Sequence, residues 1–170
     1  LVVHLYEEHG DDFVDHLNGS FAGVIWQPAT EELLLFNDCV GSRSLYYARV
    51  SGRIIFSSGV RALLADPVLP RSLDPVAIAQ LLHFEYMLDA RTYFSAVKAL
   101  QPGSLLRCRS GEIGEIRNYR RLMHAQTQPV ESEGETLERL HAHLLAAFER
   151  QLPGTLPAGI NLSGGLDSRM

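Results

Sequence analysis

This sequence of 170 residues has little cysteine and contains only Cys39 and Cys108. Neither belongs to a CxxC pair, and no cysteine and histidine stand at metal-binding spacing. A zinc site and a dense disulfide framework are therefore both excluded. We interpret the two cysteines as structural residues and expect a reducing, cytoplasmic setting.

Long apolar runs and basic clusters are missing as well. The longest strictly apolar runs, such as residues 144–148, are far shorter than the roughly 18 to 20 residues that cross a bilayer. The 15 Lys and Arg residues are outnumbered by 20 Asp and Glu residues, which gives a net charge of −5. We expect neither a membrane nor a nucleic acid as partner. Leu1 is followed by no signal-peptide pattern, and we interpret it as a cut end.

Apolar residues are plentiful and arranged as short strands. With 46% hydrophobic and 21% charged residues, the chain can bury a core. Turn residues such as Ser51-Gly52 and Ser110-Gly111 separate strand-like runs that pair naturally as antiparallel hairpins. Residues 33–36 do not alternate with polar residues, so we expect that strand to be covered on both faces. An α+β layered domain is predicted, with strands at 21–26, 33–36, 45–48, 53–57, 105–107 and 113–116.

Helix signals mark three other places. Residues 1–8 are typical of a helix that Gly10 stops, and Asp74 followed by Pro75 is a typical helix start. A capping box at residues 132–135 opens a helix that runs through Arg150 with one apolar face. The polar stretch before this helix has no clear period and is our candidate linker.

One motif near the end of the sequence carries chemistry. A short apolar strand at 160–162 is predicted to lead into a glycine-rich loop, Leu162-Ser163-Gly164-Gly165-Leu166-Asp167-Ser168. Its glycines allow backbone N–H groups to approach an anion, and its serines add hydroxyl donors, which suits a pyrophosphate. The loop lacks the lysine of the Walker type. Asp167 would hold Mg²⁺ against the phosphates, because magnesium prefers carboxylates together with substrate phosphates. The alternative is an ordinary glycine-rich turn that Asp167 caps.

The loop resembles the pyrophosphate loop of the ATP pyrophosphatases, and of the asparagine synthetases in particular. The stretch from Leu17 to Trp26 is similar to that family's L-x-G-x-F-A-x-x-x-W segment. The residues around Asp38, Leu45-Tyr46-Tyr47 and Phe56-Ser57-Ser58 resemble its R-D-x-x-G-x-x-P-L-Y-Y and F-A-S segments. Leu100-Gln101-Pro102-Gly103 matches L-x-P-G. The sequence departs from the family at Asn37, Cys39, Ser44 and Gly59.

This resemblance implies a fold and a domain division. Residues 1–118 would be the C-terminal part of a class II glutamine amidotransferase domain, a partial layered α+β sandwich of the N-terminal-nucleophile hydrolase type. Residues 119–134 would be the linker. Residues 135–170 would open an α/β ATP-pyrophosphatase domain of the adenine nucleotide alpha hydrolase type.

The resemblance also implies a reaction. The parent would use glutamine, ATP and Mg²⁺ to convert aspartate, or a related acid, into an amide with release of AMP and pyrophosphate. The catalytic cysteine would lie upstream of Leu1, which leaves no catalytic residue in this stretch. The resemblance leaves open whether the parent forms a homodimer. The alternatives are a β-lactam synthetase-like or peptide-cyclising relative with a degenerate glutaminase half, and a noncatalytic interaction module.

Overall fold

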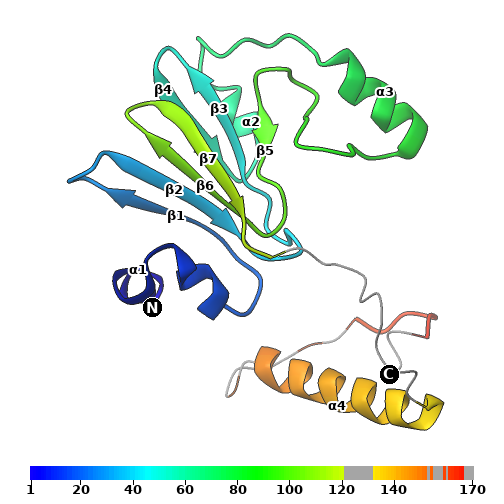
Figure 1. Cartoon of the computed structure of the whole chain (residues 1–170). Coiled ribbons are helices and arrows are strands. Elements are labelled where there is room, and N and C mark those ends of the chain that lie inside the picture. Colours follow the sequence, from blue (N-terminus) through cyan, green and yellow to red (C-terminus); the bar gives the residue numbers. More distant parts are fainter. Residues whose placement is uncertain (121–131, 153, 155–158, 160, 167–170) are drawn as a thin grey trace. The chain divides into compact units, whose positions relative to one another are not determined.

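Two antiparallel β-sheets form the body of the protein, shown in the computed structural model of Figure 1. The structure describes residues 1–120, 132–152, 154, 159 and 161–166. The chain divides into two compact units, residues 1–123 and 124–170, and the first contains both sheets. The α+β class expected from the sequence is therefore confirmed for the first unit.

Sheet A has four strands in the order β1-β2-β6-β7, all antiparallel. Its second strand is the apolar run that does not alternate, and residues 34–37 of this strand are buried. Leu34 and Phe36 point to one face of the sheet and Leu35 to the other, so both faces are covered as expected. The strands are β1 (Ala22–Gln27), β2 (Glu32–Asn37), β6 (Ser104–Arg109) and β7 (Glu112–Asn118).

Sheet B has three strands in the order β4-β3-β5, again antiparallel. The β3–β4 hairpin turns at Ser51 and Gly52, and the β6–β7 hairpin of sheet A turns at Ser110 and Gly111. All four residues have positive φ, as two-residue turns that match the twist of the strands require. The strands are β3 (Tyr46–Val50), β4 (Arg53–Ser57) and β5 (Lys98–Ala99).

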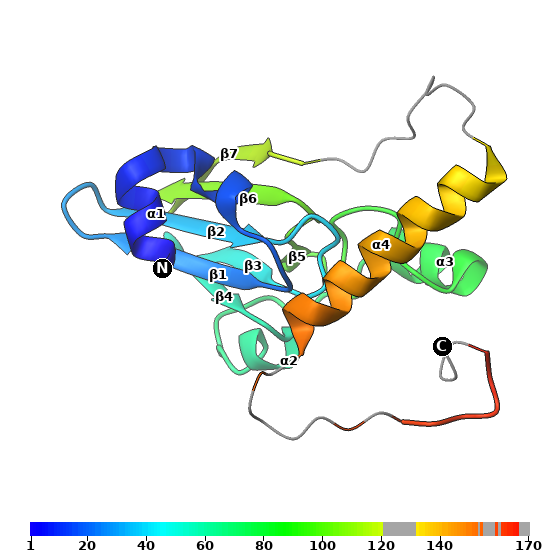
Figure 2. The ribbon, with the colours of Figure 1, turned by 90° about the horizontal axis from the view of Figure 1, so that it is seen from below.

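Three apolar clusters divide the first unit into layers. The inter-sheet cluster lies between sheets A and B and consists of Leu35, Leu45, Tyr47, Leu100, Leu106 and Cys108. A second cluster packs sheet A against α1 (Val2–His9) and the 3₁₀-helix η1 (Gly10–His16) through Phe13 and Phe36. A third packs sheet B against α2 (Val60–Leu63). The order of layers is therefore helix, sheet, sheet, helix, and Figure 2 shows it from below.

Polar contacts hold the ends of the helices. Asp74 accepts hydrogen bonds from the N–H groups of Val76 and Ala77 and caps α3 (Pro75–Phe84), as its sequence predicts.

Arg107 on β6 donates to Asp11 on η1 at 2.5 Å and to Glu32 on β2 at 2.9 Å. The hydrogen bond to Asp11 raises the pKa of the Arg107 guanidinium, so this cation stays charged while it ties η1 to sheet A.

The second unit contains one long helix, α4 (Glu133–Gln151), which begins with the expected Ser132–Glu135 capping box. Its apolar stripe of Leu137, Leu140, Leu144 and Phe148 has helical spacing, but none of its residues is buried in the structure. The short strand expected at 160–162 is wrong where it can be checked, since Asn161 and Leu162 are not in a strand. A buried parallel strand needs a neighbour to pair with, and no described strand pairs with these residues.

None of the helices in the described part of the chain combines the length and the apolar character that a membrane crossing requires.

Truncating the inter-sheet cluster should destabilise the first unit. Leu35 is fully buried, so we expect Leu35→Ala to lower the free energy of unfolding by about 2–5 kcal/mol through lost burial and the cavity left behind. Leu82→Ala, at a position 81% exposed on α3, should change it by less than about 0.5 kcal/mol. Urea unfolding of the 170-residue chain measures both values. Equal effects of the two substitutions would contradict this packing.

Candidate functional site

A trough runs between the outermost strands of the two sheets, β1 of sheet A and β4 of sheet B. It consists of two adjoining hollows of about 530 and 750 Å³ that share Val24 and Phe56. The first hollow lies toward the two hairpin turns, where Gly52 and Gly111 form part of the lining. The second lies at the other end of β1 and β4, next to Ser20 and Ser58. We call the two hollows together the inter-sheet trough.

Strand alternation decides which side chains line the trough. On β1, Ala22, Val24 and Trp26 face sheet B, whereas Ile25 packs toward the helices on the other side. Gly23 also faces the helices, and a Cβ there would lie 2.3 Å from the ring of Phe36. A glycine is therefore required at this position so that Phe36 can pack against the strand.

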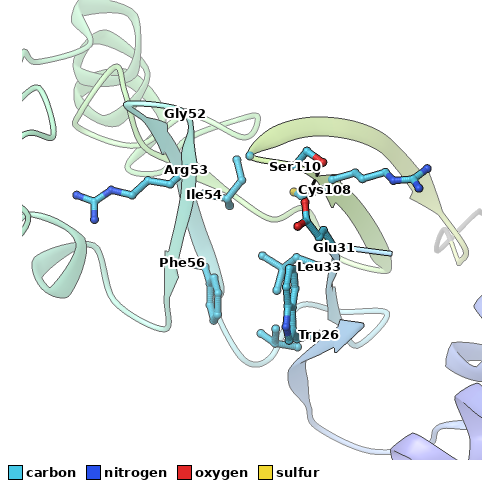
Figure 3. A pocket seen from close by; sticks show the side chains of 12 residues that line it. Trp26, Glu31, Leu33, Gly52, Arg53, Ile54, Phe56, Cys108 and Ser110 are labelled. Atoms are coloured by element: carbon cyan, nitrogen blue, oxygen red, sulfur yellow. Dashed lines mark hydrogen bonds between the residues drawn. The ribbon is translucent and has the colours of Figure 1, made fainter. Parts of the chain in front are cut away.

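The first hollow is apolar and open. Trp26 and Phe56 face each other across it, as Figure 3 shows, with Ile54 and Leu33 beside them. Trp26 is 53% exposed and Phe56 40% exposed, which is high for aromatic side chains that line the inside of a sandwich. This end of the trough therefore presents uncovered apolar surface.

Two arginines at the rim of the first hollow already have hydrogen-bond partners. Arg53 donates to Asp66 at 2.6 Å, and Arg109 donates to the carbonyl oxygen of Thr30 at 3.2 Å. Cys108 lies at the base of the hollow, and burial raises the pKa of its thiol. Cys108 is thus an uncharged thiol at neutral pH and a weak nucleophile, in agreement with its interpretation as a structural residue.

The second hollow is lined by hydroxyl groups. Ser20, Ser42, Ser57 and Ser58 contribute to it, together with Arg43. The hydroxyls of Ser20 and Ser42 lie 2.5 Å apart, and Ser42 Oγ donates to Asp38 Oδ2 at 2.5 Å. This end of the trough offers hydrogen-bond donors and one cation to a polar group.

Asp38 holds the polar end of the trough in place. It is 1% exposed and accepts hydrogen bonds from the N–H groups of Phe21, Val40 and Ser42 at 3.1 Å, besides the Ser42 hydroxyl. Burial raises the pKa of this carboxyl, but the four hydrogen bonds together hold the pKa below its usual value of 3.8. Asp38 is therefore a structural anion that joins the start of β1 to the loop after β2.

Two residues next to Asp38 complete this anchor. Asn37 Nδ2 donates to the carbonyl oxygen of Leu100, and Asn37 Oδ1 accepts from the N–H group of Ser104. The hydroxyl of Tyr119 donates to the carbonyl oxygen of Asn37 at 2.5 Å. Burial raises the pKa of Tyr119 to about 12, so its hydroxyl stays protonated and able to donate. Asn37 departs from the family pattern, and its side-chain nitrogen and oxygen are thus both hydrogen-bonded in the core.

The described trough residues can bind and orient a group, but they form no nucleophile and base pair. No histidine lines either hollow within the described residues. Asp38, the carboxylate next to the serine hydroxyls, has a lowered pKa and is a poor proton acceptor. The described part of the chain also contains no group of three or more His, Cys, Asp or Glu residues that could bind a metal ion.

The loop predicted from the sequence lies in the second unit. Leu162, Ser163, Gly164, Gly165 and Leu166 are exposed, and the N–H group of Gly165 donates to Ser163 Oγ at 3.2 Å. Asp167 and Ser168 lie outside the described residues. A Cβ at Gly164 would meet no atom of the described residues within 4 Å, and one at Gly165 would lie 3.4 Å from Ser163 Oγ. The backbone at Gly164 is therefore open to a ligand.

Sequence reasoning did not identify the trough. Trp26 and Phe56 were part of segments that resemble the family, and Ser42 was not singled out. The trough could not be predicted, because the sequence of one strand does not reveal which other strand it faces. The one available signal was alternation on β1, where Val24 and Trp26 share a face with Ala22.

Comparison with known proteins agrees with the motif analysis. Residues 1–120 match a family described as glutamine amidotransferase domain. The chain is 31% identical to amidase chyE of Penicillium rubens and 26% identical to asparagine synthetase [glutamine-hydrolyzing] 3 of Bacillus subtilis, in each case over 99% of the chain. It is 30% identical over its whole length to an asparagine synthetase [glutamine-hydrolyzing] of Asparagus officinalis. The chain spans about a quarter of the length of these curated relatives.

Asp38 should make the stability of the chain depend on pH. We expect Asp38→Asn to lower the free energy of unfolding by about 2–4 kcal/mol at pH 7, because the amide leaves buried donors without an acceptor. The folded-state pKa of Asp38 is lowered, so its contribution is present above its unfolded pKa of about 4 and is lost as the pH falls through the folded value. The variant should therefore approach the wild type at low pH.

The measurement is urea unfolding of both proteins between pH 7 and pH 2.5. Asp12→Asn, which removes the same charge at an exposed pair with Arg117, serves as the control and should cost less than about 1 kcal/mol. A pH-independent difference between Asp38→Asn and the wild type would show that the charge of Asp38 is not what stabilises the fold.

Proposed function

Because the chain belongs to the glutamine amidotransferase domain family, we propose that it is part of an ATP-dependent amide ligase of the glutamine-hydrolysing asparagine synthetase type. The parent would convert aspartate, ATP and glutamine into asparagine, AMP, pyrophosphate and glutamate. Residues 1–118 would belong to the glutaminase half and residues 135–170 to the start of the synthetase half, with a linker between them.

The observation that carries this proposal is the extent of the similarity. The amidotransferase family matches residues 1–120, but the likeness to asparagine synthetases continues over 99–100% of the chain. It therefore includes the loop from Leu162 to Ser168. An amidotransferase domain followed by an ATP-pyrophosphatase loop is the arrangement in which ammonia from glutamine meets an activated carboxylate.

The layered architecture supports the glutaminase assignment. Two antiparallel sheets stack face to face, with helices on the outside of each. We propose that this is part of an N-terminal-nucleophile hydrolase sandwich. The catalytic cysteine would then lie upstream of Leu1, in keeping with a trough whose described residues include no nucleophile and base pair.

The loop residues fit a pyrophosphate. Residues 162–166 carry no carboxylate that would repel an anion, and the backbone at Gly164 is open. The backbone N–H group of Gly164 and the hydroxyls of Ser163 and Ser168 would hold the leaving phosphates, with Leu162 and Leu166 flanking them. Gly165, whose N–H group donates to Ser163 Oγ, would shape the loop around them. Asp167 would hold Mg²⁺, which neutralises charge on the phosphate oxygens. These residues would thereby orient ATP for attack by a carboxylate on the α-phosphorus.

A second function is favoured by one specific finding. Two relatives at 30% and 31% identity are described as amidases, amidase chry2 of Gibberella zeae and amidase chyE, rather than as asparagine synthetases. A parent of this kind would use an acid other than aspartate, or form or cleave another amide. Relatives that close β-lactam rings or cyclise peptides belong to the same group of alternatives, as does a noncatalytic module. The identity of the acid substrate separates these functions.

The nucleotide products test the ligase proposal. We expect the full-length parent, given α-labelled ATP, its acid substrate and ammonia, to form labelled AMP, because the loop suits pyrophosphate and lacks the lysine of the Walker type. Thin-layer chromatography of the nucleotides is the measurement, and omission of the acid is the control. Labelled ADP as the main product would refute the proposal.

Asp167 should be essential for the same step. In the full-length parent, Asp167→Asn should slow acid-dependent ATP–pyrophosphate exchange by at least about 100-fold, since metal-assisted charge neutralisation supplies several kcal/mol. Any glutaminase activity should be largely kept. Glu115→Gln, which removes one charge from the exposed surface of β7, should leave the exchange rate unchanged. An exchange rate in Asp167→Asn equal to that of the wild type would remove Asp167 from the reaction.

A further inference from the structure

The asparagine side chains of this chain differ in how firmly the fold holds them. The sequence contains four asparagines, Asn18, Asn37, Asn118 and Asn161, and all four lie in the described part of the structure. An asparagine is labile when the backbone nitrogen of the next residue can attack its side-chain amide. The attack requires that both groups are free of hydrogen bonds and that no side chain shields the attacking nitrogen, a condition that glycine meets best.

Asn18 meets all of these conditions. It is exposed, and it precedes Gly19 in the link between η1 and β1. Neither the side chain of Asn18 nor the N–H group of Gly19 has a hydrogen-bond partner among the described residues. A Cβ at Gly19 would meet no atom of the described residues within 4 Å, so the space around this nitrogen is open. The nitrogen of Gly19 is therefore free to approach the amide carbon of Asn18.

The backbone conformation of the link makes the glycine necessary. Gly19 has a φ of 138°, a value that other residues rarely adopt. Leu17 and Phe21, on either side of the link, are partly buried in the cluster that packs sheet A against α1 and η1. The link must therefore turn between two fixed ends, and the fold requires a glycine directly after Asn18.

Asn37 is protected at both reacting groups. Its side chain is 1% exposed, and its nitrogen and oxygen are both hydrogen-bonded. The N–H group of Asp38, which would supply the attacking nitrogen, donates to the carbonyl oxygen of Phe21 at 2.9 Å. The fold therefore prevents the attack at Asn37.

The two remaining asparagines each lack a condition as well. The side-chain amide of Asn118 donates to a hydroxyl group at 3.0 Å, and the N–H group of Tyr119 donates to the carbonyl oxygen of Gly103 at 2.9 Å. Asn161 is exposed, but it is followed by Leu162, whose branched side chain shields the backbone nitrogen. Asn18 is thus the one asparagine of the four that combines an open amide with an open nitrogen.

We propose that Asn18 is a site of spontaneous self-modification, at which the chain converts its own asparagine into aspartate and isoaspartate. The backbone nitrogen of Gly19 forms a bond to Cγ of Asn18, and Nδ2 leaves as ammonia together with the proton that this nitrogen gives up. Water then opens the cyclic imide. Cleavage of the new bond to Cγ gives aspartate, and cleavage of the former peptide bond gives isoaspartate. Water is the only other reactant, so the modification is independent of the proposed ligase function.

The product places a negative charge next to the Asp38 anchor. Asn18 and Asp38 line the same small hollow, of about 40 Å³, together with Arg120. A second carboxylate in this hollow disfavours the ionised form of Asp38, whose hydrogen bond to the N–H group of Phe21 holds the start of β1. The exposed cation of Arg120 offsets only part of this repulsion. The modification would therefore weaken the first unit as the protein ages.

Peptide mass spectrometry of the 170-residue chain, aged at pH 8, tests the proposal. Asn18 should lose its amide at least about ten-fold faster than the other three asparagines, which corresponds to a barrier lower by about 1.4 kcal/mol. Aspartate and isoaspartate should both form at this position, because water can open the imide on either side. Asn18→Gln, whose longer side chain would have to close a larger ring, is the control and should keep its amide. Equal rates at all four asparagines would overturn the proposal.

Ageing of the chain in urea separates the effect of the fold from that of the sequence. Unfolding releases Asn37 and Asn118, so both should lose their amides faster in urea than in buffer of the same pH. The rate at Asn18 should change by less than about three-fold, because its link is already open in the folded chain. Loss of the Asn18 amide in urea but not in the folded chain would contradict the proposal.

Asn18→Asp tests the effect on stability, since it supplies the charge of the product. We expect it to lower the urea midpoint of the 170-residue chain at pH 7 by about 0.3 M, through repulsion of Asp38. Asn161→Asp adds the same charge in the second unit and should leave the unfolding midpoint of the first unit unchanged. Equal midpoints for Asn18→Asp and the wild type would refute the weakening of the Asp38 anchor.

Discussion

Face-to-face packing of two antiparallel sheets is the interaction on which the rest of the structure depends. Leu35 and Leu106 of sheet A and Tyr47 of sheet B are buried in the same inter-sheet cluster. This contact fixes which faces of β2 and β6 point inward, and so which faces receive α1 and η1 on the outside. The same contact sets β1 opposite β4 and creates the trough.

Local features of this structure could be predicted from the sequence. The hairpins at Ser51-Gly52 and Ser110-Gly111 and the caps at Asp74 and Ser132 depend on residues a few positions apart, whose preferences are intrinsic. The coverage of β2 on both faces also followed from its uninterrupted apolar run. These predictions were confirmed because no distant contact had to be known.

Features that depend on distant contacts could not be predicted. The trough requires Trp26 to face Phe56, which is 30 residues away, through strands that are not hydrogen-bonded to each other. The apolar stripe of α4 predicted a buried face, but no residue of this helix is buried. The strand expected at 160–162 is absent at Asn161 and Leu162 for the same reason, because a strand forms only against a neighbour. A pattern thus indicates that an apolar face will be covered without saying by what.

The central claim is that packing of sheet A on sheet B holds the first unit together. Hydrogen–deuterium exchange of backbone amides, resolved by peptide and compared between the wild type and Leu35→Ala, tests it most directly. Amides of β2, β3 and β6, which lie between other strands, should exchange slowly in the wild type and faster in the variant, in both sheets. Amides of α4, which belongs to the second unit, should exchange alike in the two proteins. Faster exchange confined to β2 in the variant would contradict the claim.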